Sequence, residues 1–318
     1  MRNKAETLEW EQRWAVPAGL ATLVGVALVI ASAFAIGNVS GDGDAELLRS
    51  AYDNSSSVTM AAVLQAVGFL FLVAPLLFIF KAAAARSDRV RYQLVGLVVA
   101  APIFLAVAAG LNAVATNDAA DAFVAGEAKP GITAKAAAAE CQDEQKDLGA
   151  KEFGEEYDGA SPPAALERCT ETKLADEEAS NAINEASTHG AAIGFGLGGR
   201  LGLAFALLYS CLYGMRTGLL TRFWGSLGMA LGVAALLLLV QFTMIWFLYA
   251  GLLLLGRLPG GKPPAWEAGE AIPWPTPGEK AAASLEGSEP FDPPDSSAPD
   301  DDGGDGSGGE RRKRKQRD

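Results

Sequence analysis

The sequence predicts an all-α integral membrane protein: a bundle of six transmembrane helices with an extracytoplasmic helical hairpin insert and a disordered C-terminal tail. Half of the 318 residues are hydrophobic although 20% are charged, which is typical of a membrane core with polar appendages. The hydrophobic residues form apolar runs of membrane-spanning length. The acidic residues gather in one segment, 116–189, where 17 acidic and 6 basic side chains give a net charge of −11, while the whole chain carries −12.

The first apolar run covers residues 15–36 and follows a polar segment, residues 1–14. Trp14 at the interface and Pro17 in the first turn are typical of the start of a membrane helix. The tripeptide at 33–35 has the A-x-A form of a signal-peptide cleavage site. However, the run is longer than a signal-peptide core, and acidic residues cancel the basic charge before it. We therefore expect an uncleaved transmembrane helix and a cytoplasmic N-terminal segment.

Two further apolar runs, residues 58–80 and 92–115, are each long enough at about 1.5 Å per residue to cross about 30 Å of hydrocarbon. They complete helices one to three within residues 15–115. Residues 38–57 are expected to form a loop, because Gly, Asp, Asn and Ser cluster there. The connection between the two runs carries four basic side chains, which predicts a cytoplasmic position. They are Lys81, Arg86, Arg89 and Arg91.

Helices four to six are predicted over residues 190–258. The first of them is followed by a loop, 216–222, and by an apolar run, 223–258. As one helix this run would be about 52 Å long and exceed the membrane core, whereas two helices meeting near residues 240–243 would each be short. Two helices keep Arg257 and the basic C terminus on the cytoplasmic side, and one helix would put them outside. We therefore expect two.

This topology places the acidic segment 116–189 outside the cytoplasm and both termini inside it. Two helix-forming stretches flank the turn-like sequence YDGASPP, so we expect an antiparallel helical hairpin. Cys141 and Cys169 then lie across from each other, and a disulfide between them would persist outside the cytosol. The alternative is two free thiols, because the sequence does not give the Cα separation that bridging requires.

Residues 259–318 are predicted to form a cytoplasmic tail in two parts. The first is rich in proline and holds Trp266 and Trp274, which is typical of an extended segment at the membrane surface or on a partner. From residue 279 onward Asp, Ser, Gly and Pro dominate, so we expect disorder. The terminal RRKRKQR offers positive charge to membrane lipids. It has no interleaved aromatic residues and no nucleic-acid fold, so no nucleic acid is expected as a partner.

Several stretches in the second half of the chain are distinctive: GRLGLAFALLY, MRTGLLTRFWGSLGM, GRLPGGKPPAWEAGEAIPWP and the basic C terminus. In these stretches the chain resembles uncharacterised bacterial multi-pass membrane proteins, mainly over residues 190–275. That family brings no known activity with it. The resemblance therefore implies a multi-pass protein of a bacterial inner membrane and no particular chemistry.

A row of glycines marks the first apolar helix of the second half. Gly190, Gly194, Gly198 and Gly202 recur at every fourth position and so share one helix face. Such a glycine zipper lets another helix approach closely, within the chain or in an oligomer. The overlapping G-x-G-x-x-G pattern lacks the preceding strand that a nucleotide site needs, so we assign the glycines to helix packing.

Arg200 is a charged residue in the middle of an apolar run, on the side of its helix opposite the glycine row. Gln65, Asn112 and Gln241 are polar residues of other runs and are expected in the same leaflet. Together the four would line an outward-open pocket for an anionic or carbonyl-bearing ligand or a lipid headgroup. The alternative is structural: Arg200 snorkels, or it pairs with Asn112, Gln65 or a loop carboxylate such as Asp118, and holds the bundle together.

No residue is predicted to be catalytic. The only histidine, His189, lies at the boundary of an apolar run, and the runs contain no carboxylate. Paired-aspartate proteolysis, metal-assisted hydrolysis and a proton relay therefore lack candidate residues, and we predict a non-enzymatic protein without metal or cofactor. Two hypotheses remain: a scaffold or sensor that binds a protein partner through the insert or the tail, and a small permease or lipid- or anion-binding protein that uses the pocket around Arg200.

Overall fold

The described part of the chain contains helices and no strands, which confirms the all-α prediction. A computed structural model describes residues 4–274 except 158, 238–239 and 259–260. The tail that we predict to be disordered therefore lies outside the described residues. The helices are α1 (Lys4–Ala35), α2 (Asp44–Asp53), α3 (Ser55–Phe71), α4 (Val73–Arg86), α5 (Val95–Val124), α6 (Ala134–Leu148), α7 (Ala150–Glu156), α8 (Pro162–Glu185), α9 (His189–Arg216), α10 (Arg222–Leu236), α11 (Thr243–Leu254) and α12 (Ala265–Ala268), with two short 3-10 helices, η1 (Tyr92–Leu94) and η2 (Val240–Phe242).

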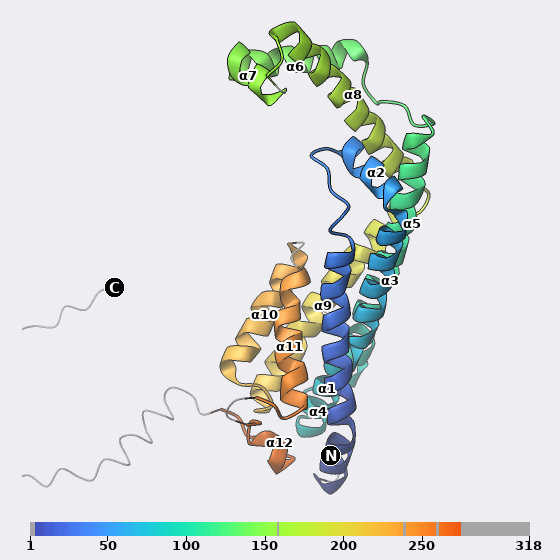
Figure 1. The fold of residues 1–318 in the computed structure, drawn as a ribbon. Coiled ribbons are helices and arrows are strands. Elements are labelled where there is room, and N and C mark those ends of the chain that lie inside the picture. Colours follow the sequence, from blue (N-terminus) through green and yellow to red (C-terminus); the bar gives the residue numbers. More distant parts are fainter. Residues whose placement is uncertain (1–3, 158, 238–239, 259–260, 275–318) are drawn as a thin grey trace, which may run out of the picture. The chain divides into compact units, whose positions relative to one another are not determined.

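Four helical stretches of the described chain are long and apolar enough to cross a membrane (Figure 1). They are α1, α3 together with α4, η1 together with α5, and α9. A break at Leu72 separates α3 from α4, because Pro75 has no N–H to donate and its ring crowds the carbonyl four residues earlier. Pro102 lies inside α5 without interrupting it. These four stretches give the chain the character of a membrane protein.

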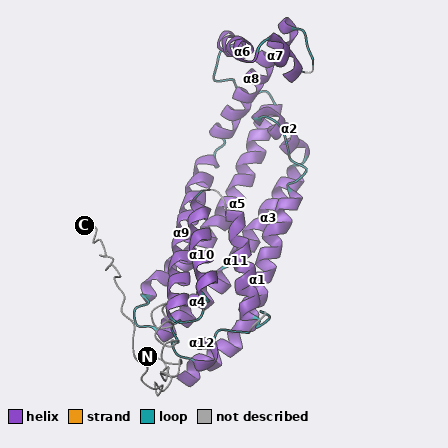
Figure 2. Ribbon diagram, turned by 90° about the vertical axis from the view of Figure 1, so that its left-hand side faces the viewer, coloured by secondary structure: helices purple, strands orange, loops and turns teal. Residues whose placement is uncertain are grey.

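The apolar run 223–258 folds as two helices rather than one. α10 has 15 residues and α11 has 12, so both are shorter than the four stretches above. They lie side by side, with α10 packed on α9 and α11 packed on α1 (Figures 1 and 2). The single helix of about 52 Å that the sequence left open is therefore excluded. The described chain has four helices of spanning length and, in addition, this shorter α10–α11 hairpin.

The segment predicted to be a loop, residues 38–57, contains α2, so that prediction was wrong. Ala45, Leu48 and Ala51 lie on one face of α2 and are buried, and the helix packs against α5 and α8. The polar residues that suggested a loop occupy its other positions. A carboxylate oxygen of Asp176 in α8 accepts a hydrogen bond from the backbone N–H of Ala45 at 3.0 Å, which satisfies one of the free donors at the start of α2.

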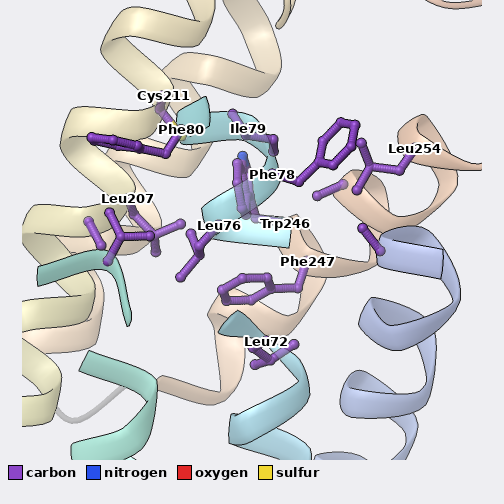
Figure 3. Close-up of a cluster of buried hydrophobic side chains, with 14 of the residues drawn as sticks. Leu72, Leu76, Phe78, Ile79, Phe80, Leu207, Cys211, Trp246, Phe247 and Leu254 are labelled. Atoms are coloured by element: carbon purple, nitrogen blue, oxygen red, sulfur yellow. The ribbon is translucent and has the colours of Figure 1, made fainter. Parts of the chain in front are cut away.

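The bundle core gathers bulky side chains from α4, α9 and α11 (Figure 3). Trp246 and Phe247 of α11 are fully buried. The indole N–H of Trp246 donates to the carbonyl of Trp224 at 3.1 Å, so the only polar atom of this ring is satisfied inside apolar surroundings. Their neighbours in the core include Leu72, Leu76, Ile79, Phe80, Leu207 and Cys211.

α5 and α9 make the most extensive helix pair, and glycines bring their backbones together. A Cβ atom on Gly199 would lie 2.8 Å from the side chain of Leu105. One on Gly202 would lie 2.8 Å from the Cβ of Ala101. Residues without a side chain are what allow helices to approach this closely in a membrane.

Beyond the bundle, α6, α7 and α8 form a small helical subdomain, seen at the top of Figures 1 and 2. α6 and α7 both contact α8, and α8 continues along α2 and α5. α5 itself extends past residue 115, where we expected the insert to begin, and reaches Val124. The subdomain is therefore carried on the continuation of a membrane helix rather than on a loop.

The other end of the bundle holds a buried ion pair between Arg86 of α4 and Glu11 of α1. Their side chains are 0% and 5% exposed, and one guanidinium N–H donates to the carboxylate at 2.9 Å. Arg86 also donates to the carbonyl of Ala265 at 2.9 Å. The neighbouring Trp266 donates its indole N–H to the carbonyl of Leu219 at 2.9 Å. One guanidinium thus joins α1, α4 and the segment around α12.

Replacing Arg86 with leucine should destabilise the protein by about 3 to 5 kcal/mol, because Glu11 would keep a buried charge without a partner. Thermal unfolding in detergent measures the effect. Lys4→Leu is the matched control, since Lys4 and Glu270 form an exposed pair at 3.8 Å and such pairs contribute about 1 kcal/mol or less. The double variant Glu11→Leu, Arg86→Leu should recover part of the loss. Equal unfolding temperatures for Arg86→Leu and Lys4→Leu would contradict this account.

Candidate functional site

A pocket of about 290 Å³ lies between α3, α5 and α9 beside the end of the α10–α11 hairpin. Arg200 of α9, Asn112 of α5 and Gln65 of α3 all line it, and we call it the Arg200 pocket. Gln241 is exposed and is not among the described residues that line the pocket, although its neighbour Val240 is. The structure thus brings together three of the four residues predicted to cluster.

These three polar side chains are not engaged with one another. Arg200 and Gln65 are half-buried, and Asn112 is exposed. Within the described part of the chain none of the three side chains has a hydrogen-bond or ion-pair partner. The hydroxyl of Thr116 donates to the backbone carbonyl of Asn112 at 2.8 Å and leaves the Asn112 amide free. The pairing of Arg200 with Gln65, Asn112 or Asp118 that we considered is therefore not seen among the described residues.

The shape of the pocket follows from helix periodicity and small side chains. Ile193, Leu197 and Arg200 are spaced by four and three residues, so they share one face of α9. Ala108, Ala192 and Gly196 line the same space with little side-chain volume. The hollow that this leaves exposes a guanidinium, which only donates hydrogen bonds, next to two amides, which donate and accept. This combination is suited to a carboxylate, a phosphate or a carbonyl oxygen.

The glycine row of α9 divides into two parts. Gly198 faces the ring of Phe104, and Gly202 lies against Ala101 of α5. Among the described residues, no atom outside the adjoining backbone of α9 lies within 4 Å of the place where a Cβ of Gly190 or Gly194 would stand. Close packing within this chain therefore involves the half of the row nearer the bundle core.

Sequence reasoning did not identify the apolar members of the pocket. Ile193, Leu197 and Val240 are ordinary residues of apolar runs, so composition does not mark them. The spacing from Arg200 gives the first two, since residues three and seven positions away lie on its face of the helix. Val240 carried no such signal, because its position depends on how the α10–α11 hairpin ends.

His189 is the first residue of α9. No group of three or more His, Cys, Asp or Glu side chains that could hold a metal ion occurs among the residues that the structure describes. The Arg200 pocket presents a guanidinium and two amides, which can bind a ligand through charge and hydrogen bonds.

Cys141 of α6 and Cys169 of α8 form a disulfide, with their Cα atoms 6.0 Å apart. Both are buried together with Phe153 and Ala165 in a small core of the subdomain. Lys173 lies on the same subdomain and pairs with Glu144 at 3.1 Å. Its hydrogen bond to that carboxylate raises the pKa of Lys173. The disulfide therefore belongs to a folded, ion-paired unit and not to an open loop.

Comparisons with protein-family models, with curated proteins and with solved structures find no match for this chain. A function therefore has to be assigned from the Arg200 pocket and from the disulfide-linked subdomain. Of these two features, only the pocket presents unpaired polar side chains inside an otherwise apolar helix surface.

Removing the disulfide should loosen the α6–α8 subdomain and leave the bundle unchanged. For a loop of this length the chain-entropy contribution is about 3 to 4 kcal/mol. In the variant Cys141→Ser, Cys169→Ser, amide hydrogen exchange should accelerate in α6 and α8 but not in α9 and α11. Cys211→Ala is the control for the bundle. That thiol is buried in the bundle core, so its replacement should affect exchange in the bundle helices and not in α6 and α8. Unchanged exchange in α6 and α8 would show that the small apolar core alone holds the subdomain.

Proposed function

We propose that this protein is a non-enzymatic integral membrane protein that binds an anionic group in the Arg200 pocket. The observation that carries the proposal is a guanidinium in the middle of an apolar helix that faces a shared pocket with Asn112 and Gln65 and has no partner in the described chain. An arginine at such a depth costs roughly 2.5 to 3.5 kcal/mol on insertion scales. A bound anion would offset that cost, which no salt bridge to Arg200 within the described chain offsets.

The geometry favours an anion over a cation or a neutral apolar ligand. The guanidinium offers up to five N–H donors and no acceptor, and the two amides add donors beside it. Charge-assisted hydrogen bonds of this kind are about twice as strong as neutral ones. Hydrogen bonds to a phosphate or carboxylate would also be stronger in this pocket than in water, since the surrounding side chains are largely apolar.

For the orientation, we infer that the insert lies outside the cytoplasm and that both ends of the chain face the cytoplasm. The disulfide supports this, because structural disulfides persist in oxidising compartments. The basic connections at 81–91 and 216–222 support a cytoplasmic position for the opposite end of the bundle. In this arrangement the α10–α11 hairpin enters and leaves on the cytoplasmic side, whether or not it crosses the whole membrane.

A second candidate function is a scaffold or sensor that holds an external partner through the insert. The observation in its favour is that the α6–α8 subdomain is folded and disulfide-linked, while its segment of the sequence is strongly acidic. A basic protein surface or a cation would complement it. Substitution of Arg200 distinguishes the two candidate functions, because a partner bound by the insert does not need the guanidinium.

Arg200→Leu should strongly lower the retention of anionic lipid. The protein would be purified in nanodiscs of phosphatidylcholine doped with phosphatidylglycerol, and lipid bound to the released protein would be identified by native mass spectrometry. Loss of charge-assisted hydrogen bonds should lower retention about tenfold or more. Arg200→Lys should keep part of it, since a lysine retains the charge but not the planar fork.

Arg216→Leu is the matched control on the same helix, because Arg216 lies exposed over the ring of Tyr213 at 5.7 Å. It should retain phosphatidylglycerol as the parent protein does. If Arg200→Leu retains as much lipid as Arg216→Leu, binding of anionic lipid in this pocket is refuted.

The orientation predicts opposite labelling of the two ends of the bundle. In intact cells a membrane-impermeant maleimide should label Lys151→Cys in α7, and it should label Asp88→Cys only after permeabilisation. Both positions are exposed, so a difference reports the side of the membrane rather than burial. Labelling of both positions in intact cells would rule out this orientation.

A further inference from the structure

The α10–α11 hairpin ends partway along α9. α10 has 15 residues, a length of about 22 Å, whereas α9 has 28 residues, about 42 Å. Val240, at the end of the hairpin, lines the same pocket as Arg200. At its His189 end α9 therefore continues past the hairpin (Figure 1). Residues of this part of α9, including Ile193 and Leu197, line the pocket together with Val240.

Two described residues at the end of the hairpin, Leu237 and Phe242, are apolar and exposed. Leu237 is 70% exposed and Phe242 is 53% exposed, and residues 237–243 include no charged residue. A connection between helices that emerges into water is normally polar and rich in turn residues. Large exposed apolar side chains at this connection indicate contact with lipid chains instead.

The rim of the pocket on α9 has the same character. Ile193 is 49% exposed and Leu197 is 52% exposed, and both line the pocket next to Arg200. The guanidinium thus lies at a boundary between a polar hollow and an apolar surface. A small hydrated anion gains nothing from that surface, whereas an amphiphile can bury its chains against it at about 25 cal/mol per Å².

We propose that the ligand of the Arg200 pocket is an anionic amphiphile that enters sideways from the half of the bilayer on the side of the insert, across the uncharged end of the α10–α11 hairpin. Its phosphate or carboxylate accepts hydrogen bonds from Arg200 and from the amides of Asn112 and Gln65. Its chains rest on Ile193, Leu197 and the end of the hairpin and stay in the bilayer. This inference rests on the proposed function, because it names the ligand class and the route for the same pocket.

Photo-crosslinking tests the route. A phosphatidylglycerol with a diazirine in one acyl chain would be incorporated into nanodiscs with the full-length protein, and crosslinked peptides would be identified by mass spectrometry. We expect crosslinks in peptides containing Ile193, Leu197 or Phe242 above the level given by a phosphatidylcholine with the same diazirine. The excess should disappear in Arg200→Leu and remain in Arg216→Leu. Equal crosslinking by the two lipids at these peptides would overturn the inference.

Two soluble probes distinguish a lipid headgroup from a free anion. Inorganic phosphate and glycerol phosphate would be titrated into the protein in phosphatidylcholine nanodiscs, and the rise in unfolding temperature would be measured. Leu197→Trp, which narrows the opening toward the bilayer, should lower phosphatidylglycerol retention about tenfold or more. The unfolding temperature of Leu197→Trp without ligand shows whether the variant folds, and Phe205→Trp, at an exposed position of α9 outside the pocket, is its matched control.

The outcomes separate the two proposals. Strong Arg200-dependent stabilisation by the soluble anions, without selective lipid crosslinks, would leave the proposed anion binding intact and overturn the amphiphile and the lateral route. Absence of any Arg200-dependent binding, by lipid or by soluble anion, would overturn the proposed function itself. Selective crosslinks that depend on Arg200 and fall in Leu197→Trp would support both.

Discussion

The close contact between α5 and α9 is the constraint on which the rest of the structure depends. Gly199 and Gly202 leave no room for a Cβ beside Leu105 and Ala101, so the two backbones meet where most helix pairs are held apart by side chains. This contact fixes the rotation of α9. Once Gly199 faces α5, the next residue, Arg200, is turned by about 100° and points beside the contact rather than into it. Asn112 reaches the same space because it lies farther along the partner helix.

Two arginines of the bundle show how environment decides what a buried guanidinium does. Arg86 is fully enclosed and is matched by Glu11 and by a backbone carbonyl, so its charge is compensated within the chain. Arg200 is half-buried and faces a pocket with amides but no carboxylate. A charge withdrawn from water needs compensation. Arg86 has it within the described chain, whereas the half-buried Arg200 remains open to water or to a bound anion. This contrast favours a structural role for Arg86 and a ligand-binding role for Arg200.

The sequence predicted the features that follow from hydrophobicity and periodicity and missed those that follow from tertiary placement. All-helical structure and the four long apolar helices follow from run lengths. Arg200, Gln65 and Asn112 were found because polar residues are conspicuous in apolar runs, and helix geometry then gives their direction. Gln241 failed to join them because it lies in the short 3-10 helix at the end of the α10–α11 hairpin, where the period of an α-helix does not apply. α2 was missed because its apolar face consists of only three buried residues amid polar ones, and packing on α5 and α8 supplies the stability that the segment lacks by itself.

The two candidate functions meet on α5 and α9. These helices line the Arg200 pocket, and α5 also contacts α2 and α8, which carry the disulfide-linked subdomain. A hydrogen bond from the Thr188 hydroxyl to the carbonyl of Leu111, at 3.2 Å, joins the start of α9 to α5 one residue from Asn112. A ligand in the pocket therefore acts on the same pair of helices that supports the insert. Binding at one place changes affinity at the other only to the extent that it favours one α5–α9 arrangement over another.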